Sequence, residues 1–103
     1  MNKLQFAISL ARRSGHLVTG FDRVKEKVER GERDTVLIAS DLSAKSSERV
    51  RRFSQGHAEV YECGLTQYDI SLGCGKLTGI LTTDDENIAV LFRKAMDEMK
   101  GEQ

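Results

Sequence analysis

The residues with the clearest chemical potential are one lysine and three glycines within a short stretch. Lys76 is surrounded by Gly73, Gly75 and Gly79, with apolar residues at both ends of the stretch. Glycine reaches backbone conformations that are closed to other residues, and it lets another group approach the main chain closely. A lysine held in such a turn can neutralise a phosphate, so the first hypothesis for this stretch is phosphate binding.

The stretch does not fit the phosphate loop of nucleotide-binding proteins. That loop has its leading glycine five residues earlier and a Ser or Thr after the lysine, whereas Leu77 follows Lys76 here. It also runs from a strand into a helix, but here a short helix precedes the glycines and residues 79–82 are predicted to form a strand. Two alternatives remain. One is a helix C-cap and a tight turn into the strand, and the other is an exposed loop that offers Lys76 and its backbone to RNA.

Other residue types that could do chemistry do not form a recognisable site. Cys63 and Cys74 make no CxxC pair and have no zinc-ligand spacing with the two histidines, which favours small buried residues. The acidic run 84–86 is expected to favour a helix N-terminus rather than to bind a metal. No Ser/His/Asp set, Cys/His pair or carboxylate pair is recognisable. We therefore expect no enzyme, no cofactor, no metal and no small-molecule substrate.

Composition predicts a single domain with no membrane segment. The 103 residues include 16 basic and 16 acidic ones, so the net charge of zero gives no overall attraction to nucleic acid, although a local basic face remains possible. The apolar run at residues 4–11 is too short to span a membrane and lacks the features of a signal peptide. We expect a cytoplasmic protein with one domain at residues 1–100 and a frayed tail at residues 101–103.

Apolar spacing predicts helices that alternate with strands. The expected helices lie within residues 2–15, 20–31 and 43–56, from 66 to the glycine stretch, and from 83 onward, and the expected strands lie at residues 16–19, 35–39, 58–63 and 79–82. Helices on both faces of a small four-stranded mixed sheet follow from this order. The continuous apolar run Val36–Ala39 is expected to be the most buried strand.

Capping signals place the last two helices. Thr66 and Asp69 form one predicted capping box, and Thr83 with Glu86 forms a second. The last helix is expected to bury five apolar residues at helical spacing, namely Ile88, Leu91, Phe92, Ala95 and Met99.

Several segments occur in an order that resembles a known family. Residues 14–20 (SGHLVTG) precede a helix that ends in Glu29-Arg30-Gly31, the strand 36–39 is followed by Ser40-Asp41, and Gly75-Lys76 is followed by residues 81–87 (LTTDDEN). Together they resemble the kink-turn-binding ribosomal-protein family of archaea and eukaryotes, and its small bacterial YlxQ-type members. The resemblance implies a three-layer α/β/α sandwich without catalytic activity.

The resemblance also implies RNA binding by two neighbouring segments. One is the start of the second helix, which reads purine pairs in an RNA bend, and the other is the loop before the last strand, which packs on flipped-out bases. We expect these segments to lie side by side. The implied RNA-binding residues are Gly20, Phe21, Asp22, Arg23, Lys25, Glu26, Gly75, Lys76, Leu77 and Thr78.

The chain departs from the family at the second helix. Kink-turn binders carry Asn-Glu after the glycine and a Lys three residues beyond the Glu, and these positions are Asp22, Arg23 and Glu26 here. Acidic side chains repel phosphates, so we expect weak kink-turn specificity and RNA binding that depends on Arg23, Lys25 and Lys76. The alternative is a protein-interaction module on the same fold.

For two further features, a structural interpretation competes with a functional one. Phe21, just inside a helix, is more often a core residue than a stacking platform for a base. A stripe of Lys45, Arg49 and Arg52 on the third helix, with Glu48 next to it, is most often a solvated face.

Overall fold

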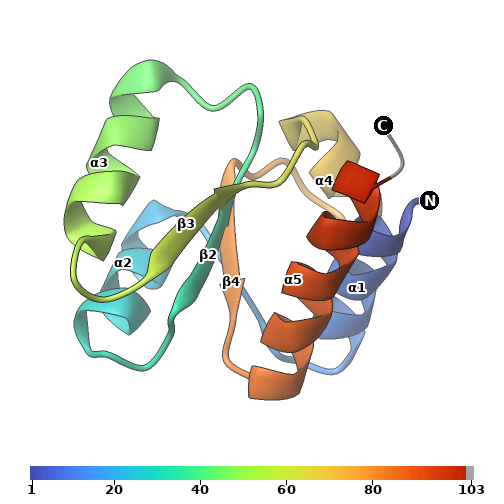
Figure 1. The fold of residues 1–103 in the computed structure, drawn as a ribbon, viewed down its shortest axis with the longest axis horizontal. Helices are drawn as coiled ribbons and strands as arrows, with labels where there is room; N and C mark the ends of the chain where they lie inside the picture. The colour runs from blue at the N-terminus through green and yellow to red at the C-terminus, as the bar shows by residue number, and fades with distance from the viewer. Residues whose placement is uncertain (102–103) are drawn as a thin grey trace.

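A computed structural model describes residues 1–101, which form an α/β fold around one sheet (Figure 1). The sheet has the order β1-β4-β2-β3 and consists of β1 (Leu17–Thr19), β2 (Thr35–Ile38), β3 (Glu59–Glu62) and β4 (Ile80–Thr83). Strand β4 is antiparallel to both of its neighbours, whereas β2 and β3 are parallel. The predicted four-stranded mixed sheet is therefore confirmed.

Helices cover both faces of this sheet. Figure 1 shows α2 and α3 on one face and α1, α4 and α5 on the other. Their bounds are α1 (Lys3–Arg13), α2 (Phe21–Glu29), α3 (Ala44–Ser54), α4 (Gln67–Cys74) and α5 (Glu86–Gly101). The three-layer α/β/α sandwich is the predicted architecture.

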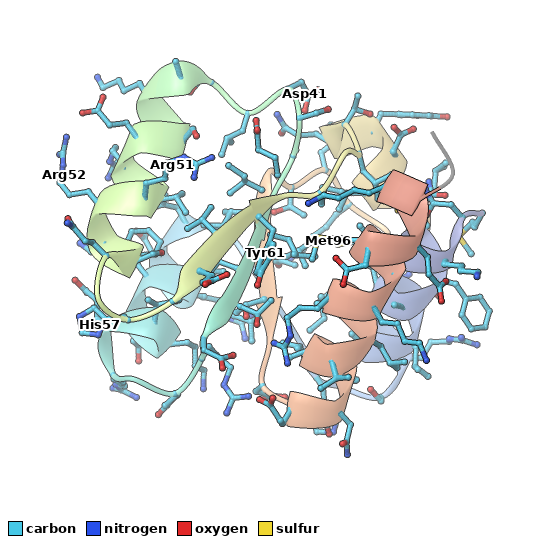
Figure 2. The ribbon with its side chains drawn as sticks, viewed as in Figure 1. Asp41, Arg51, Arg52, His57, Tyr61 and Met96 are labelled. Atoms are coloured by element: carbon cyan, nitrogen blue, oxygen red, sulfur yellow. The ribbon has the colours of Figure 1, made fainter. Side chains whose placement is uncertain are left out.

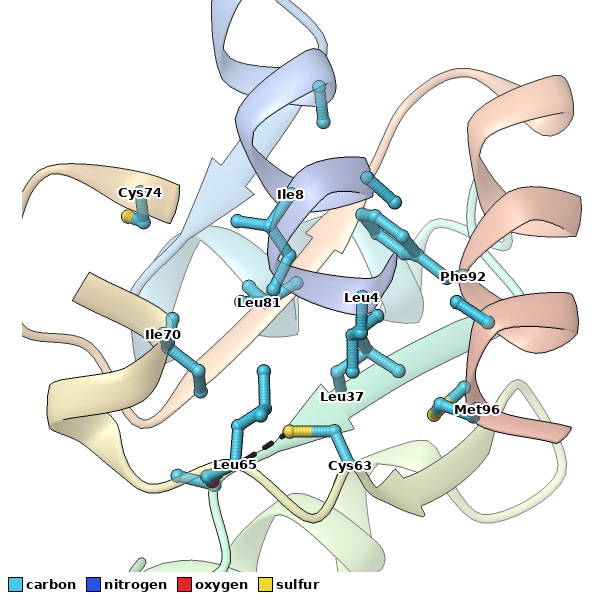
Figure 3. Close-up of a cluster of buried hydrophobic side chains, with 14 of the residues drawn as sticks. Leu4, Ile8, Leu37, Cys63, Leu65, Ile70, Cys74, Leu81, Phe92 and Met96 are labelled. Carbon is cyan, nitrogen blue, oxygen red and sulfur yellow. Dashed lines mark hydrogen bonds between the residues drawn. The ribbon is translucent and has the colours of Figure 1, made fainter. Parts of the chain in front are cut away.

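Each face of the sheet has its own apolar core. Leu37 and Leu81 contribute to the core under α1, α4 and α5, where Phe92 packs near Leu4 and Ile8 (Figure 3). On the opposite face, the valines of α2 and α3 pack on the remaining strand side chains, and this core consists of Val18, Val24, Val28, Val36, Ile38, Val50 and Ile80. Alternate residues of β2 thus enter opposite cores, which explains its unbroken apolar sequence. Residues 36–39 are each at most 2% exposed, as predicted, and the neighbouring strand β4 is also buried throughout.

One predicted capping box is confirmed and the other is wrong. The Thr66 hydroxyl accepts from the Asp69 amide at 3.1 Å and the Asp69 carboxylate accepts from the Thr66 amide at 3.2 Å. Thr83 instead ends β4, where its hydroxyl donates to the His16 carbonyl at 2.6 Å. The start of α5 is capped by the carboxylate of Asp85, which accepts from the amide of residue 88 at 3.0 Å.

The buried face of α5 differs from the prediction at one position. Ile88, Phe92 and Ala95 are buried and Met99 is partly buried, but Leu91 is 42% exposed. Leu91 lies about 100° around the helix from the centre of the buried face, because each residue turns an α-helix by about 100°. Met96 is buried there instead.

Two further findings concern the end of α5 and the search for membrane-spanning helices. Gly101, which we expected in a frayed tail, is the last residue of α5, and residues 102 and 103 lie outside the described part. Across residues 1–101, no helix combines the length and the apolar character needed to cross a membrane.

Candidate nucleic-acid interface

A basic hollow lies where α1 ends, α2 begins and the chain leaves α4. Its volume is about 330 Å³, and it is lined by Arg12, Gly15, Leu17, Thr19, Arg23, Cys74, Gly75 and Lys76. We call this site the α1–α2 hollow. Three of its lining residues are cationic and none is acidic. In a chain with a net charge of zero, this is a local concentration of positive charge.

The floor of the hollow is built by Gly75 and Arg12. Helix α4 ends at Cys74 and is capped by Gly75, which has a φ of 86° and donates its amide to the Ser71 carbonyl at 2.8 Å. A Cβ atom at this position would lie only 2.6 Å from Nη1 of Arg12, so the guanidinium rests directly on the glycine backbone. Gly75 is therefore favoured for its left-handed conformation, and a side chain at this position would displace the flexible end of Arg12.

Close packing of α1 on α4 brings Arg12 to this position. Gly73 faces α1 so closely that a Cβ atom would lie 2.5 Å from the Gln5 carbonyl oxygen. The Gln5 side-chain amide also donates to the Asp69 carbonyl at 2.9 Å. With the two backbones held together, the end of α1 lies beside the end of α4, and Arg12 reaches across it.

The start of α2 forms the other side of the hollow. Gly20 has a φ of 93°, and its amide donates to the Ile80 carbonyl at 3.2 Å, which joins the start of α2 to the beginning of β4. No side chain caps this helix. The first amides of an α-helix have no partner within the helix, and the helix dipole adds positive potential there, so this end of α2 favours an anion.

The two segments expected to form one site do lie together. Arg23 of α2 and the Gly75-Lys76 pair line the same hollow, although more than fifty residues separate them in the sequence. The interpretation of the glycine stretch as a helix C-cap and turn is confirmed, and Lys76 and Leu77 are also exposed. The loop is thus exposed, as the other alternative requires, and its contact with RNA stays a prediction.

Phe21 and Lys25 lie away from the α1–α2 hollow. The Phe21 ring packs against α3, with its centroid 5.3 Å from that of Phe53 in an edge-to-face arrangement, and Lys25 faces the same side of α2. Residues four apart share a helix face, whereas Arg23 is turned toward the opposite flank of α2. Lys25 therefore lines a different pocket from Arg23 and Lys76, and its predicted contact with RNA stays a prediction.

The side chain of Thr78 is largely buried. It is only 9% exposed, and its hydroxyl donates to the Ile80 carbonyl at 3.0 Å because the chain turns into β4 there. Leu77 is 69% exposed at the tip of the loop. Leu77 therefore presents an apolar side chain to solvent beside Lys76.

The two acidic residues of α2 face solvent. Asp22 and Glu26 are exposed, and Glu26 forms an ion pair with Arg30 at 3.0 Å one turn further along the helix. This pair compensates the charge of Glu26 locally, although exposed pairs are weak. Neither acidic residue lines the α1–α2 hollow.

Arg12 is the residue of the hollow that sequence reasoning missed. An arginine in the last turn of a helix is ordinarily explained by the helix dipole, which was the only role that its position indicated. Its contact with Gly75 depends on the packing of α1 against α4. A glycine after a helix, with no side chain of its own, is the single sequence signal that another group could lie there.

The other candidates for chemistry have structural roles. Within residues 1–101, no group of three potential ligands is arranged to hold a metal ion. Cys63 and Cys74 are buried and free, and burial raises the pKa of the Cys63 thiol. In the acidic run, Asp84 contacts the His16 ring at 2.7 Å and Asp85 caps α5.

Comparison with known proteins gives a family match and a structural match. The sequence profile of the ribosomal protein L7Ae/L30e/S12e/Gadd45 family matches residues 2–91. Among solved structures, the chain is similar to a protein of unknown function from Bacillus halodurans, with 18% sequence identity and a TM-score of 0.82 over 94% of this chain and 99% of that one. At this identity the likeness shows the fold alone. No curated protein matches the sequence.

Proposed function

The chain belongs to the ribosomal protein L7Ae/L30e/S12e/Gadd45 family, and from this premise we propose that it is a non-catalytic protein that binds structured RNA. The proposed binding site is the α1–α2 hollow together with the exposed tip of the loop after α4. We further propose that the RNA is ribosomal or a similarly folded cytoplasmic RNA.

One observation carries the proposal: Arg12, Arg23 and Lys76 converge on one hollow from three separate elements. Phosphate contacts by Lys and Arg supply most of the affinity of proteins for nucleic acids. The uncapped start of α2 adds backbone donors beside these cations. The exposed Leu77 side chain supplies an apolar surface on which an unstacked base can pack.

The number of cations sets the expected salt dependence. If each of the three neutralises one phosphate, the hollow contributes about −2.7 to the slope of log affinity against log salt, using the value for a duplex. This contribution alone lowers the affinity roughly 40-fold between about 50 and 200 mM salt. Kink-turn selectivity is expected to be weak because Asp22 and Glu26 replace groups that would donate to RNA or neutralise it.

Fluorescence anisotropy of a labelled kink-turn RNA and a scrambled RNA at the two salt concentrations tests the proposal. Arg12→Gln and Lys76→Gln should each make the slope shallower by about 0.9, so the part of the salt effect due to the hollow falls to roughly 12-fold. Arg51→Gln is the matched control, because it removes the same charge from α3 on the other face of the sheet (Figure 2). Equal effects of Arg12→Gln and Arg51→Gln would contradict the site.

The acidic positions provide a test of selectivity. The double change Asp22→Asn with Glu26→Lys should increase the preference for the kink-turn over the scrambled RNA, because it restores a neutral amide and a cation at these positions. If the wild-type protein already binds kink-turns tightly and selectively, and the double change weakens that selectivity, the charge explanation is wrong.

A second candidate function is a protein-interaction module on the same fold. The observation that favours it is an apolar groove between α1 and α5, where Phe6 is 58% exposed beside Leu10 and Leu91. Exposed apolar patches of this kind often mark contacts with other proteins. This candidate replaces RNA binding if the wild-type protein binds neither RNA at about 50 mM salt.

A further inference from the structure

A second basic groove lies on the opposite flank of α2, and we propose that it binds the phosphate backbone of the same RNA. We call it the α2–α3 groove, and it is lined by Phe21, Lys25, Glu29, Arg49, Arg52 and Phe53. This proposal rests on the proposed function, because it assigns a further contact surface to the RNA held at the α1–α2 hollow.

The charges of the groove favour a polyanion. Three lining residues are cationic and one, Glu29, is acidic, which is an excess of positive charge in a chain whose total is zero. Arg52 shares its charge with Glu48 through an exposed ion pair at 2.8 Å, and such pairs hold a side chain only weakly. Lys25 and Arg49 form no ion pair with any of residues 1–101.

Arg49 is held in place without using its hydrogen-bond donors. Its guanidinium carbon lies 4.1 Å from the centroid of the Phe21 ring, and Phe21 is itself fixed edge-to-face against Phe53. No acceptor among residues 1–101 takes a hydrogen bond from this guanidinium. A planar guanidinium stacked on a ring keeps its N–H groups directed outward, where they can bind phosphate oxygens in a bidentate manner.

The position of the groove relative to the α1–α2 hollow favours nucleic acid as its ligand. Arg23 and Lys25 project from opposite flanks of α2, so the helix separates the α2–α3 groove from the α1–α2 hollow. An α-helix with its side chains is about 10–12 Å across. An RNA that crosses the start of α2 therefore reaches cations on both sides, and a repeating phosphate backbone matches two separated sets of cations.

The test compares variants of the groove with variants of the hollow, using the same labelled kink-turn and scrambled RNAs. Arg49→Gln and Lys25→Gln should each make the log–log salt slope shallower by about 0.9 with both RNAs, since phosphate contacts carry no sequence information. Arg49→Lys should keep the slope, because the positive charge remains. Arg51→Gln, two residues away on the same helix, is the matched control and should leave the slope unchanged.

Folding controls keep the result interpretable. Arg49→Gln removes the guanidinium from the Phe21 ring, so its thermal melting temperature is measured beside that of the wild type. Lys25→Gln leaves the stacked Arg49 in place. If the arginine variant does not fold, the lysine variant alone decides the proposal.

The outcomes separate this proposal from the proposed function. If Arg12→Gln makes the slope shallower while Arg49→Gln and Lys25→Gln behave like Arg51→Gln, RNA binding stands and the α2–α3 groove is not a contact surface. If the wild-type protein binds neither RNA, both proposals fail. If Arg49→Gln abolishes binding of a poly-glutamate peptide but leaves RNA binding unchanged, the groove binds an acidic protein partner and the nucleic-acid proposal is overturned.

Discussion

Replacing Gly73 by alanine should separate α1 from α4. Gly73 lies within α4, and an added Cβ atom would meet the Gln5 carbonyl oxygen at 2.5 Å and the Cβ atom of Ile8 at 3.5 Å. The oxygen belongs to the backbone of α1, so it cannot rotate away as the end of a side chain could. The two helices must therefore move apart by about 1 Å to reach an ordinary contact distance.

The expected change in the free energy of unfolding combines one stabilising and two destabilising effects. Alanine in a helix gains about 1 kcal/mol over glycine. Overpacking against a backbone atom costs about 1–3 kcal/mol. The hydrogen bond from the Gln5 side chain to the Asp69 carbonyl, now 2.9 Å, is worth about 1 kcal/mol and is weakened as the helices separate. We expect a net destabilisation of about 2 kcal/mol, which lowers the melting temperature by about 8–16 °C.

Circular dichroism during thermal and urea denaturation measures this effect. Leu72→Ala is the matched control, because Leu72 is the preceding residue of α4 and is 52% exposed, so its truncation should change the free energy of unfolding by about 0.5 kcal/mol or less. RNA affinity of the folded Gly73→Ala variant should also fall, since Arg12 is placed by the same packing. A variant as stable as the wild type, or more stable, would refute the close approach of α1 and α4.

Three further predictions concern single sites. Gly75→Ala should cost about 1 kcal/mol through its left-handed backbone and should also weaken RNA binding, because the new methyl group displaces Arg12; denaturation and anisotropy measure the two effects separately. Asp85→Ala should lower the free energy of unfolding by about 1 kcal/mol and Glu86→Ala by less, because Asp85 caps α5; equal losses in urea denaturation would contradict this assignment. Burial raises the pKa of the Cys63 thiol in the folded protein. The buried neutral thiol therefore makes its full contribution to the free energy of unfolding below its ordinary pKa of 9.0, and this contribution is lost as the pH rises above that value. Cys63→Ala should therefore show a smaller loss of stability above that pH, and an unchanged profile would count against a buried neutral thiol.

The fold could be predicted because its signals are local. Alternating apolar periods defined the helices and strands, and the capping box of Thr66 and Asp69 fixed the start of α4. The errors arose where tertiary contacts outweighed local pattern. Thr83 bonds to the His16 carbonyl at the end of its strand instead of capping α5, and Leu91 lies beyond the face that α5 presents to the core.

The candidate site was less predictable because it depends on which flank of a helix a residue occupies. Sequence resemblance grouped Arg23 with Phe21 and Lys25, but the turn of α2 sends Arg23 toward Lys76 and the other two toward α3. Arg12 joins the hollow only through the packing of α1 on α4. Whether the site residues bind RNA remains a prediction for the titrations described above.

The position of β4 in the sheet also determines when, during translation, the α1–α2 hollow can form. Strand β1 lies at the edge of the sheet beside β4, and β4 is synthesised more than sixty residues later. During translation, the start of α2 therefore emerges well before the Ile80 carbonyl that anchors Gly20, and before the loop that carries Lys76. A nascent chain that stops short of β4 cannot assemble the α1–α2 hollow, so the hollow forms only after β4 has been synthesised.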